Sequence, residues 1–235
     1  ASTAAGNRNT ILLNVPEGTN VVFMDDDIKQ VVMEDLGLVP LDTPGLTTAP
    51  LHKIGQQIMP FCDMYFDDVV LTEDMRVGKK GEGFRNLMKN FEVERCLICA
   101  QVLGLAQAAM DDAAAYASER ICFGRPIVSF ELIQQKLADM EIALQNTRNM
   151  LYRTLWKMDT GQSVRIDSAL LKRYAAQQCT WVCSEALQIY GGLGFTTETR
   201  LGRLWLDCRG MQIAGGTDEI MVYIAGRQIA KEYAR

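Results

Sequence analysis

The apolar residues of this chain change their spacing at Phe84, and this change sets what the chain can fold into. From Phe84 onward they recur at helical intervals, as in Ile98, Val102 and Leu105. The preceding residues form short β-rich runs instead, of which Cys62 to Leu71 is rich in Tyr, Phe and Val. The chain is therefore expected to be α+β and mainly α, with a β-strand segment followed by helices.

The β segment is predicted to end at about residue 79. Thr10 to Val15 and Val21 to Phe23 are typical of strands, and Asp42 to Gly45 is typical of a turn. The glycine-containing stretch Lys79 to Gly83 then interrupts the pattern. These signals divide the chain into a part comprising residues 1–79 and a part comprising residues 80–235.

The first two of four predicted helices follow Phe84. The second helix places apolar residues on one face and ends at Gly161, where a glycine can close the last turn. The apolar residues of that face are Ile133, Leu137, Met140, Leu144, Leu151, Leu155 and Met158.

A third helix is predicted from an Asp167 N-cap to Leu187, and a fourth from about Asp218 to Tyr233 with Thr217 as its N-cap. The third helix carries large apolar residues on one face, namely Leu170, Tyr174 and Trp181. Four amphipathic helices with short connections predict an antiparallel four-helix bundle.

The charge and histidine content exclude several classes of function. Lys and Arg total 24 and Asp and Glu total 29, for a formal net charge of −5, which disfavours binding to nucleic acid or to an anionic membrane. No apolar run is expected to reach the length of a membrane-spanning helix. His52 is the single histidine, so a multi-histidine metal site is excluded and no metal is expected.

The seven cysteines are spread through apolar stretches, which indicates buried free thiols in a reducing compartment. Cys96 and Cys99 have the CxxC spacing, but they lie inside a helical pattern. Core packing is therefore favoured over redox chemistry for this pair.

Two glycine-rich segments lie at helix ends. Gln188 to Phe195 follows the third helix, where glycines allow a positive φ and a close approach of a ligand to the backbone. A simple C-cap turn is the alternative reading of this segment. Gly215 to Glu219 precedes the fourth helix, whose first N–H groups can bind an anion or a carbonyl oxygen.

Together, several segments resemble the acyl-CoA dehydrogenase family in order and spacing, from about residue 60 to the end of the chain. The segments are Phe66 to Val69, Gly81 to Phe84, Glu119 to Gly124, Leu137 to Met140, Gln188 to Phe195 and Gly216 to Glu219. The resemblance implies that residues 1–79 are part of the family's middle β domain. It also implies that residues 80–235 are its C-terminal four-helix-bundle domain.

The resemblance further implies a function, cofactor and partners. Members of this family bind FAD at a dimer interface and oxidise an acyl-CoA thioester to the 2-enoyl-CoA. Electrons pass to an electron-transferring flavoprotein, and the enzymes are homo-oligomers, either dimers or tetramers. The location implied is the bacterial cytoplasm or the mitochondrial matrix.

Carried over by resemblance, Arg120 pairs with the flavin pyrophosphate and Phe123 packs against the cofactor. Close relatives often have Gln at the position of Glu131, where a carboxylate near phosphates would be repelled. Glu131 is therefore expected to turn away or to pair with a cation. Other residues expected to contact FAD, through the backbone or at the start of the fourth helix, are Gln188, Ile189, Tyr190, Gly191, Gly192, Thr217, Asp218 and Glu219.

The general base is predicted to be Glu94. Many family members carry the base at the position of Gly215, which has no side chain to accept a proton. A smaller branch, which includes isovaleryl- and long-chain-type enzymes, has Gly there and a Glu just before an Arg on the first bundle helix. Glu94 matches that Glu, and Glu92 is the near alternative.

The backbone N–H of Gly215 is still expected to donate to the thioester carbonyl, since this role needs no side chain. From residue volume alone, Ala214 and Gly215 are expected to leave space for a branched, bulky or polar acyl group. Burial is expected to raise the pKa of Glu94 towards the range of a base that works near neutral pH.

A complete family member is roughly half as long again, as expected for three domains. The chain is therefore expected to be a fragment, or to need a partner that supplies the rest. Alternatives to dehydrogenation are a non-catalytic or degenerate flavoprotein subunit, an enoyl-CoA reductase and an acyl-CoA oxidase. A plain helical scaffold accounts for the bundle, but it does not account for the two glycine-rich helix ends.

Overall fold

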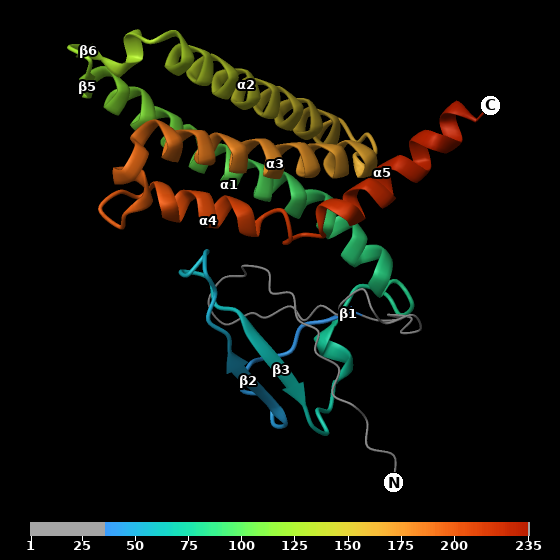
Figure 1. Cartoon of the computed structure of the whole chain (residues 1–235). Helices are drawn as coiled ribbons and strands as arrows, with labels where there is room; N and C mark the ends of the chain where they lie inside the picture. The colour runs from blue at the N-terminus through green and yellow to red at the C-terminus, as the bar shows by residue number, and fades with distance from the viewer. Residues whose placement is uncertain (1–35, 235) are drawn as a thin grey trace. The chain divides into compact units, whose positions relative to one another are not determined.

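The computed structural model describes residues 36–234, so the strands predicted at Thr10 to Val15 and Val21 to Phe23 lie outside the described residues. The chain divides into two compact units, Ala1–Asn90 and Phe91–Arg235, here called unit 1 and unit 2 (Figure 1).

Unit 1 contains two short antiparallel ladders. Strand β1 (Leu36–Gly37) pairs with β4 (Arg76–Val77), and β2 (Leu46–Pro50) pairs with β3 (Cys62–Phe66). A 3-10 turn, η1 (Glu73–Met75), precedes β4. The predicted strand from Cys62 is shorter than expected, because Asp68 has a φ of 51° that turns the chain.

The predicted turn before β2 is present and requires glycine. Gly45 has a φ of +87°, and a β-carbon there would lie 2.0 Å from the carbonyl oxygen of Asp67. The small core of unit 1 forms around Val39, Leu46 and Met64.

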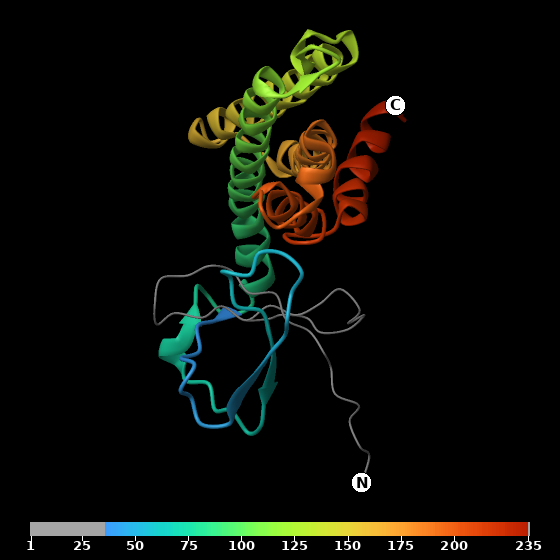
Figure 2. The same ribbon diagram turned by 60° about the vertical axis from the view of Figure 1, so that its left-hand side comes forward.

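Unit 2 is helical, and the expected fold class is confirmed. Helix α3 packs against α2, α4 and α5, and Figure 2 shows α1 running alongside this group. In chain order the elements are α1 (Gly83–Glu119), β5 (Ile121–Cys122), β6 (Arg125–Pro126), η2 (Ile127–Ser129), α2 (Glu131–Asp159), α3 (Arg165–Tyr190), η3 (Gly191–Phe195), α4 (Leu201–Gly210) and α5 (Asp218–Tyr233). The first residues of α1 belong to unit 1.

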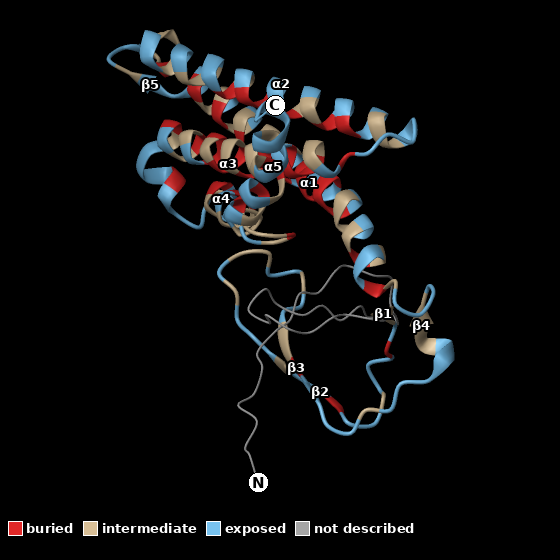
Figure 3. Ribbon diagram, turned by 90° about the vertical axis from the view of Figure 1, so that its right-hand side faces the viewer, coloured by how far each residue is buried: buried red, intermediate tan, exposed pale blue. Residues whose placement is uncertain are grey.

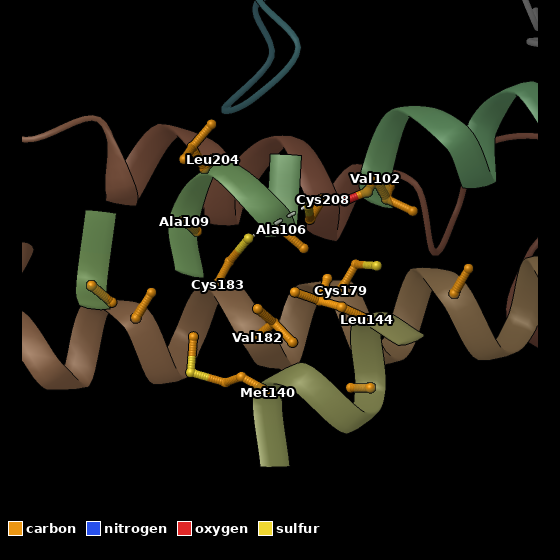
Figure 4. Close-up of a cluster of buried hydrophobic side chains, with 14 of the residues drawn as sticks. Val102, Ala106, Ala109, Met140, Leu144, Cys179, Val182, Cys183, Leu204 and Cys208 are labelled. Carbon is orange, nitrogen blue, oxygen red and sulfur yellow. Dashed lines mark hydrogen bonds between the residues drawn. The ribbon is translucent and has the colours of Figure 1, made fainter. Parts of the chain in front are cut away.

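The helices of unit 2 meet through small side chains. Ala109 and Ala113 of α1 and Ala175 and Ala186 of α3 are fully buried in one core. Figure 3 shows buried positions on α1 and α3 in red, and Figure 4 shows Ala109 within this core. Of the large residues predicted to share one face of α3, Trp181 packs against the core, whereas Leu170 is 40% exposed. Small residues let the helix backbones approach closely, and the larger Leu171 and Val182 of α3 are buried in the same core.

The observed starts of α5 and α3 can be compared with the two predicted N-caps, Thr217 and Asp167. Thr217 is the N-cap of α5, and its side chain accepts a hydrogen bond from the Ile220 N–H, as predicted. Asp167 is not the N-cap of α3, which begins at Arg165. The Asp167 carboxylate instead accepts from Nζ of Lys157 at 2.9 Å, so an ion pair with α2 takes the place of a cap.

Helix α4 (Leu201–Gly210) was not predicted from the sequence. It lies between the two glycine-rich segments, and its own Gly202 and Gly210 weaken a helical pattern. Leu201, Leu204 and Cys208 nevertheless bury its apolar side in the core.

Helix α1 is the one helix among residues 36–234 that is long and apolar enough, by length and composition, to cross a membrane. The expectation that no apolar run reaches this length is therefore wrong. The buried residues of α1, among them Val102, Ala106 and Ala109, pack in the helical core. The apolar composition of α1 therefore serves helix packing.

The cysteines are free thiols, and Cys96 and Cys99 are buried in the core, which confirms the packing interpretation of this pair. Cys183 and Cys208 also face each other within the core, with 3.7 Å between their sulfur atoms (Figure 4).

Candidate active site

Glu94 is a buried acid on the core side of α1, in unit 2. Only 8% of its surface is exposed, and the neighbouring Arg95 is 5% exposed. Within the described part of the chain, Oε2 of Glu94 has no hydrogen-bond partner. A buried carboxylate oxygen that lacks a donor is costly to charge, so it is suited to accept a proton.

Burial raises the pKa of Glu94 from its ordinary value of 4.5 to about 7, and the positive charge of Arg95 partly opposes this rise. A carboxylate with a pKa near neutrality exists in both protonation states at physiological pH, which suits a general base. Glu92, the alternative base, is only half-buried.

Gly215 lies beside Glu94, in a turn where two successive glycines have left-handed backbone conformations. The φ angles are +66° at Gly215 and +96° at Gly216. A β-carbon on Gly215 would lie 3.8 Å from Oε1 of Glu94 and 2.5 Å from Cδ1 of Ile98. Residue volume predicted space beside Gly215 for a bulky acyl group, but the Ile98 side chain partly fills that space.

Two buried cations hold the carbonyl oxygens of this turn. Nε of Arg95 donates to the Gly215 oxygen at 3.4 Å. Nζ of Lys172 donates to the oxygens of Gln212 at 3.1 Å and Gly216 at 2.6 Å. Lys172 was not predicted from the sequence, although the apolar residues Ala169 to Leu171 before it were a signal of burial.

Two predicted cofactor residues at the start of α5, Asp218 and Glu219, differ in whether their side chains are accessible to a cofactor. The Asp218 carboxylate is buried and is engaged by Gln177 Nε2 at 3.0 Å and Lys172 Nζ at 3.5 Å, so its side chain is not free for a cofactor. Glu219 is exposed, and hydrogen bonds from its own backbone N–H and from the Thr217 hydroxyl lower its pKa.

Arg120 and Phe123 lie at the far end of α1, in and beside the β5–β6 hairpin. Arg120 is exposed, and Phe123 is 97% exposed with a φ of 52°. The Phe123 ring meets the Phe130 ring edge-on at 6.3 Å between centroids. An aromatic side chain with almost no cover within its own chain offers a contact surface to another molecule.

The glycine-rich exit of α3 lies beside the same end of α1. The Tyr190 ring stacks on Tyr116 with 4.1 Å between centroids, and the Tyr190 hydroxyl donates to the Asp112 carbonyl oxygen at 3.3 Å. Gly191, the C-cap of α3, has a φ of +60°, a region that favours glycine. β-Carbons built on Gly191 and Gly192 meet no atom within 4 Å, so a ligand has room to approach this backbone.

Two other predicted cofactor residues near this end are constrained by their position. The Ile189 side chain is buried in the helical core, which leaves only its backbone for a ligand, while Gln188 is exposed. Glu131 is exposed in the first turn of α2. There the positive end of the helix dipole favours a carboxylate, so Glu131 needs no cofactor to explain it.

Residues 81–230 match the family model for the acyl-CoA dehydrogenase C-terminal domain. The chain belongs to the acyl-CoA dehydrogenase family. Among curated relatives, it is 48% identical over 190 residues to the probable acyl-CoA dehydrogenase YdiO of Escherichia coli strain K12. That match covers 81% of this chain and 50% of the relative. The chain thus spans about half the length of the curated relatives it matches.

Solved acyl-CoA dehydrogenases have the same fold. The enzyme from Slackia heliotrinireducens is 34% identical with a TM-score of 0.80, over 95% of this chain and 64% of that one. The butyryl-CoA dehydrogenase of Megasphaera elsdenii is 28% identical with a TM-score of 0.83, over 97% of this chain and 66% of that one.

The chain does not bring all of its predicted site residues together. Glu94 and Gly215 lie side by side, and Thr217 is two residues beyond Gly215, whereas Arg120 and Phe123 lie at the other end of α1. At 1.5 Å per residue, α1 separates Glu94 from Arg120 by about 39 Å. The residues predicted to contact FAD therefore lie at two separate places in one copy of the chain.

Proposed function

We propose that the chain takes part in FAD-dependent α,β-dehydrogenation of an acyl-CoA thioester, with Glu94 as the general base. The observation that carries this proposal is a buried carboxylate, with a pKa raised to about 7, beside the backbone of Gly215. A base of this strength, next to a backbone able to bind a carbonyl oxygen, is what removal of a weakly acidic α-proton requires.

In the proposed mechanism, Glu94 takes the α-proton and Gly215 binds the thioester carbonyl through its N–H. Among residues 36–234, that N–H donates no hydrogen bond, so it is available to a substrate oxygen. A hydrogen bond to the carbonyl stabilises the negative charge that develops as the proton leaves. Bound FAD would supply the acceptor for the hydride that leaves the β-carbon.

The residues at these two places fit an extended dinucleotide shared between copies of the chain. Arg120 supplies an exposed cation for the pyrophosphate, Phe123 an exposed aromatic surface, and Gly191 and Gly192 an open backbone. Thr217 follows Gly215 by two residues in the turn beside Glu94, so it would meet the reactive end. Because about 39 Å of helix separates the two places, we propose that each FAD is bound by two copies of a homo-oligomer.

The outer face of α2 and α3 supports self-association further. It exposes Leu132, Ile142 and Trp156. It also has a hollow of about 320 Å³ whose lining includes Tyr174 and Trp181. Exposed apolar surface of this kind is typical of protein interfaces.

Three further assignments belong to this proposal. Residues 1–79 are part of a middle β domain, and residues 80–235 form the C-terminal bundle domain, in keeping with the family match over 81–230.

The electron acceptor is an electron-transferring flavoprotein. A solved structure described as an electron transferring flavoprotein of Acidaminococcus fermentans resembles 96% of this chain, at 27% identity and a TM-score of 0.86.

The test is anaerobic reduction of the bound flavin by a panel of saturated acyl-CoA thioesters. Bleaching of the flavin absorbance by at least one thioester, with formation of the 2-enoyl-CoA, is expected. No bleaching by any member of the panel would refute the proposal and favour a non-catalytic subunit. Rapid reoxidation of the reduced flavin by O₂ would point to an oxidase instead.

A further inference from the structure

Lys172 is a charged residue with no exposed surface, and the proposed reaction assigns it no task. Its side chain is completely buried on α3. Removing an ammonium group from water costs several kcal/mol unless its hydrogen bonds are replaced. Lys172 has three donors, and it meets three acceptors: the carbonyl oxygens of Gln212 and Gly216 and the carboxylate of Asp218.

All three acceptors belong to the segment that carries Gly215. The Gln212 carbonyl precedes Gly215 in the chain, whereas Gly216 and Asp218 follow it. Other α3 side chains hold the same segment: Arg173 donates to the Asp218 carbonyl oxygen at 3.0 Å and Gln177 to its carboxylate at 3.0 Å. One cation therefore bridges the two ends of the turn.

The turn needs such a restraint because of its composition. Gly215 and Gly216 are both in left-handed conformations, and glycine loses more conformational freedom than any other residue when it is fixed. Two adjacent glycines would sample many backbone states without external contacts.

The anchored carbonyls also set where the N–H groups point. In a trans peptide the C=O and the next N–H point in opposite directions. Arg95 on the Gly215 oxygen therefore turns the Gly216 N–H away from Arg95, and Lys172 on the Gly216 oxygen turns the Thr217 N–H away from Lys172. Along the chain, the Gly215 N–H lies between two anchored carbonyls, that of Gln212 and that of Gly215 itself.

We infer that Lys172 is a positioning residue, which fixes the double-glycine turn so that the Gly215 N–H is held ready for the thioester carbonyl beside Glu94. This inference rests on the proposed function. It assigns Lys172 no contact with substrate or flavin, since its donors are all used within the chain.

The test compares Lys172→Met with a matched control, Lys157→Met. Lys157 also pairs with a carboxylate, that of Asp167, and it does not touch residues 212–218. Hydrogen exchange without flavin or substrate measures the turn directly. Lys172→Met is expected to raise amide exchange in residues 212–218 by about tenfold or more, and the control is expected to leave it unchanged.

A second readout is the infrared frequency of a ¹³C-labelled thioester carbonyl in bound acyl-CoA. The native protein loaded with FAD is expected to lower this frequency relative to free substrate, and Lys172→Met to lose at least half of the shift. We also expect Lys172→Met to lower kcat by about 10- to 100-fold, with KM changed less than about threefold. Should Lys172→Met not fold, Lys172→Gln keeps an N–H donor without the charge and is expected to change each readout in the same direction.

The outcomes separate the two proposals. If the native protein lowers the carbonyl frequency and the Lys172 variants keep both that shift and the slow exchange, the positioning role is refuted and the proposed function stands. If the native protein neither shifts the carbonyl nor bleaches with any thioester, the proposed function fails, and with it the role of the turn in binding the carbonyl.

Discussion

The Cδ1 atom of Ile98 lies only 2.5 Å from the position that a β-carbon on Gly215 would take. Gly215 also has a φ of +66°. We expect Gly215→Ala to lower the free energy of unfolding by about 1–3 kcal/mol, because it adds both a steric overlap and backbone strain. Chemical denaturation measures this loss.

A glycine in open space is the control for this substitution. Gly104 is exposed within α1, and a β-carbon there meets no atom within 4 Å. Gly104→Ala should therefore stabilise the protein by about 0.5–1 kcal/mol. The double variant Ile98→Val, Gly215→Ala should have a free energy of unfolding at least about 0.5 kcal/mol higher than the sum of the two single effects predicts. Strict additivity would show that Ile98 and Gly215 do not compete for space.

Glu94→Gln is expected to stop removal of the α-proton while FAD binding survives. The amide has nearly the same shape as the carboxylate but cannot accept the proton, so the rate of α-proton exchange in bound acyl-CoA should fall about 10²- to 10⁴-fold. Glu92→Gln, two residues away on the same helix, serves as the control and should keep most of the exchange. A loss in Glu92→Gln instead would move the base to Glu92.

The rate of flavin reduction should depend on pH through Glu94. With a pKa of about 7, the carboxylate is mostly protonated at pH 5.5 and mostly ionised at pH 8.5. Because only the ionised form accepts the proton, kcat/KM should rise about tenfold per pH unit below 7 and level off above it. Stopped-flow absorbance measures this profile, and a rate independent of pH between 5.5 and 8.5 would argue against Glu94.

The same burial should make stability depend on pH in the opposite sense. The folded pKa of about 7 lies above the ordinary value of 4.5, so the folded state holds the proton more tightly. The stability that Glu94 contributes is complete below pH 4.5 and is lost as the pH rises to about 7. Glu94→Gln should therefore match the native protein at pH 4 and exceed its unfolding free energy by about 3 kcal/mol at pH 8. Urea denaturation at both pH values checks this difference.

Phe123→Ala should weaken FAD binding without weakening the fold. The side chain is 97% exposed, so its removal should change the unfolding free energy by less than about 0.5 kcal/mol. Tyr233→Ala, another exposed aromatic residue, is the control and should affect neither property. Fluorescence titration with FAD measures the affinity, and unchanged affinity in Phe123→Ala would remove Phe123 from the cofactor site.

Much of the bundle could be predicted from the sequence, because its long helices repeat apolar residues at a regular period. Thr217 was identified as a cap because its preference is local to the turn that it closes. Asp167 was misassigned because a distant partner, Lys157, decides its role. Helix α4 was missed because its glycines weaken a local pattern that only tertiary packing restores.

The candidate site was predictable to a similar extent. The loss of a side chain at Gly215 and the presence of Glu94 before Arg95 are visible in the sequence. The burial that raises the pKa of Glu94 and the clash at Ile98 both depend on contacts between distant residues. Lys172 shows this limit most clearly, since its acceptors lie 40 or more residues away in the chain.

The complete burial of Lys172 has a chemical consequence for a protein that handles thioesters. Free lysine amines on a surface are open to acylation by reactive thioesters, which would neutralise their charge. Lys172 offers no surface to such an attack, and its ammonium group is held in hydrogen bonds to Gln212, Gly216 and Asp218. The cation nearest the double-glycine turn is thus shielded from the very compounds that the turn is proposed to bind.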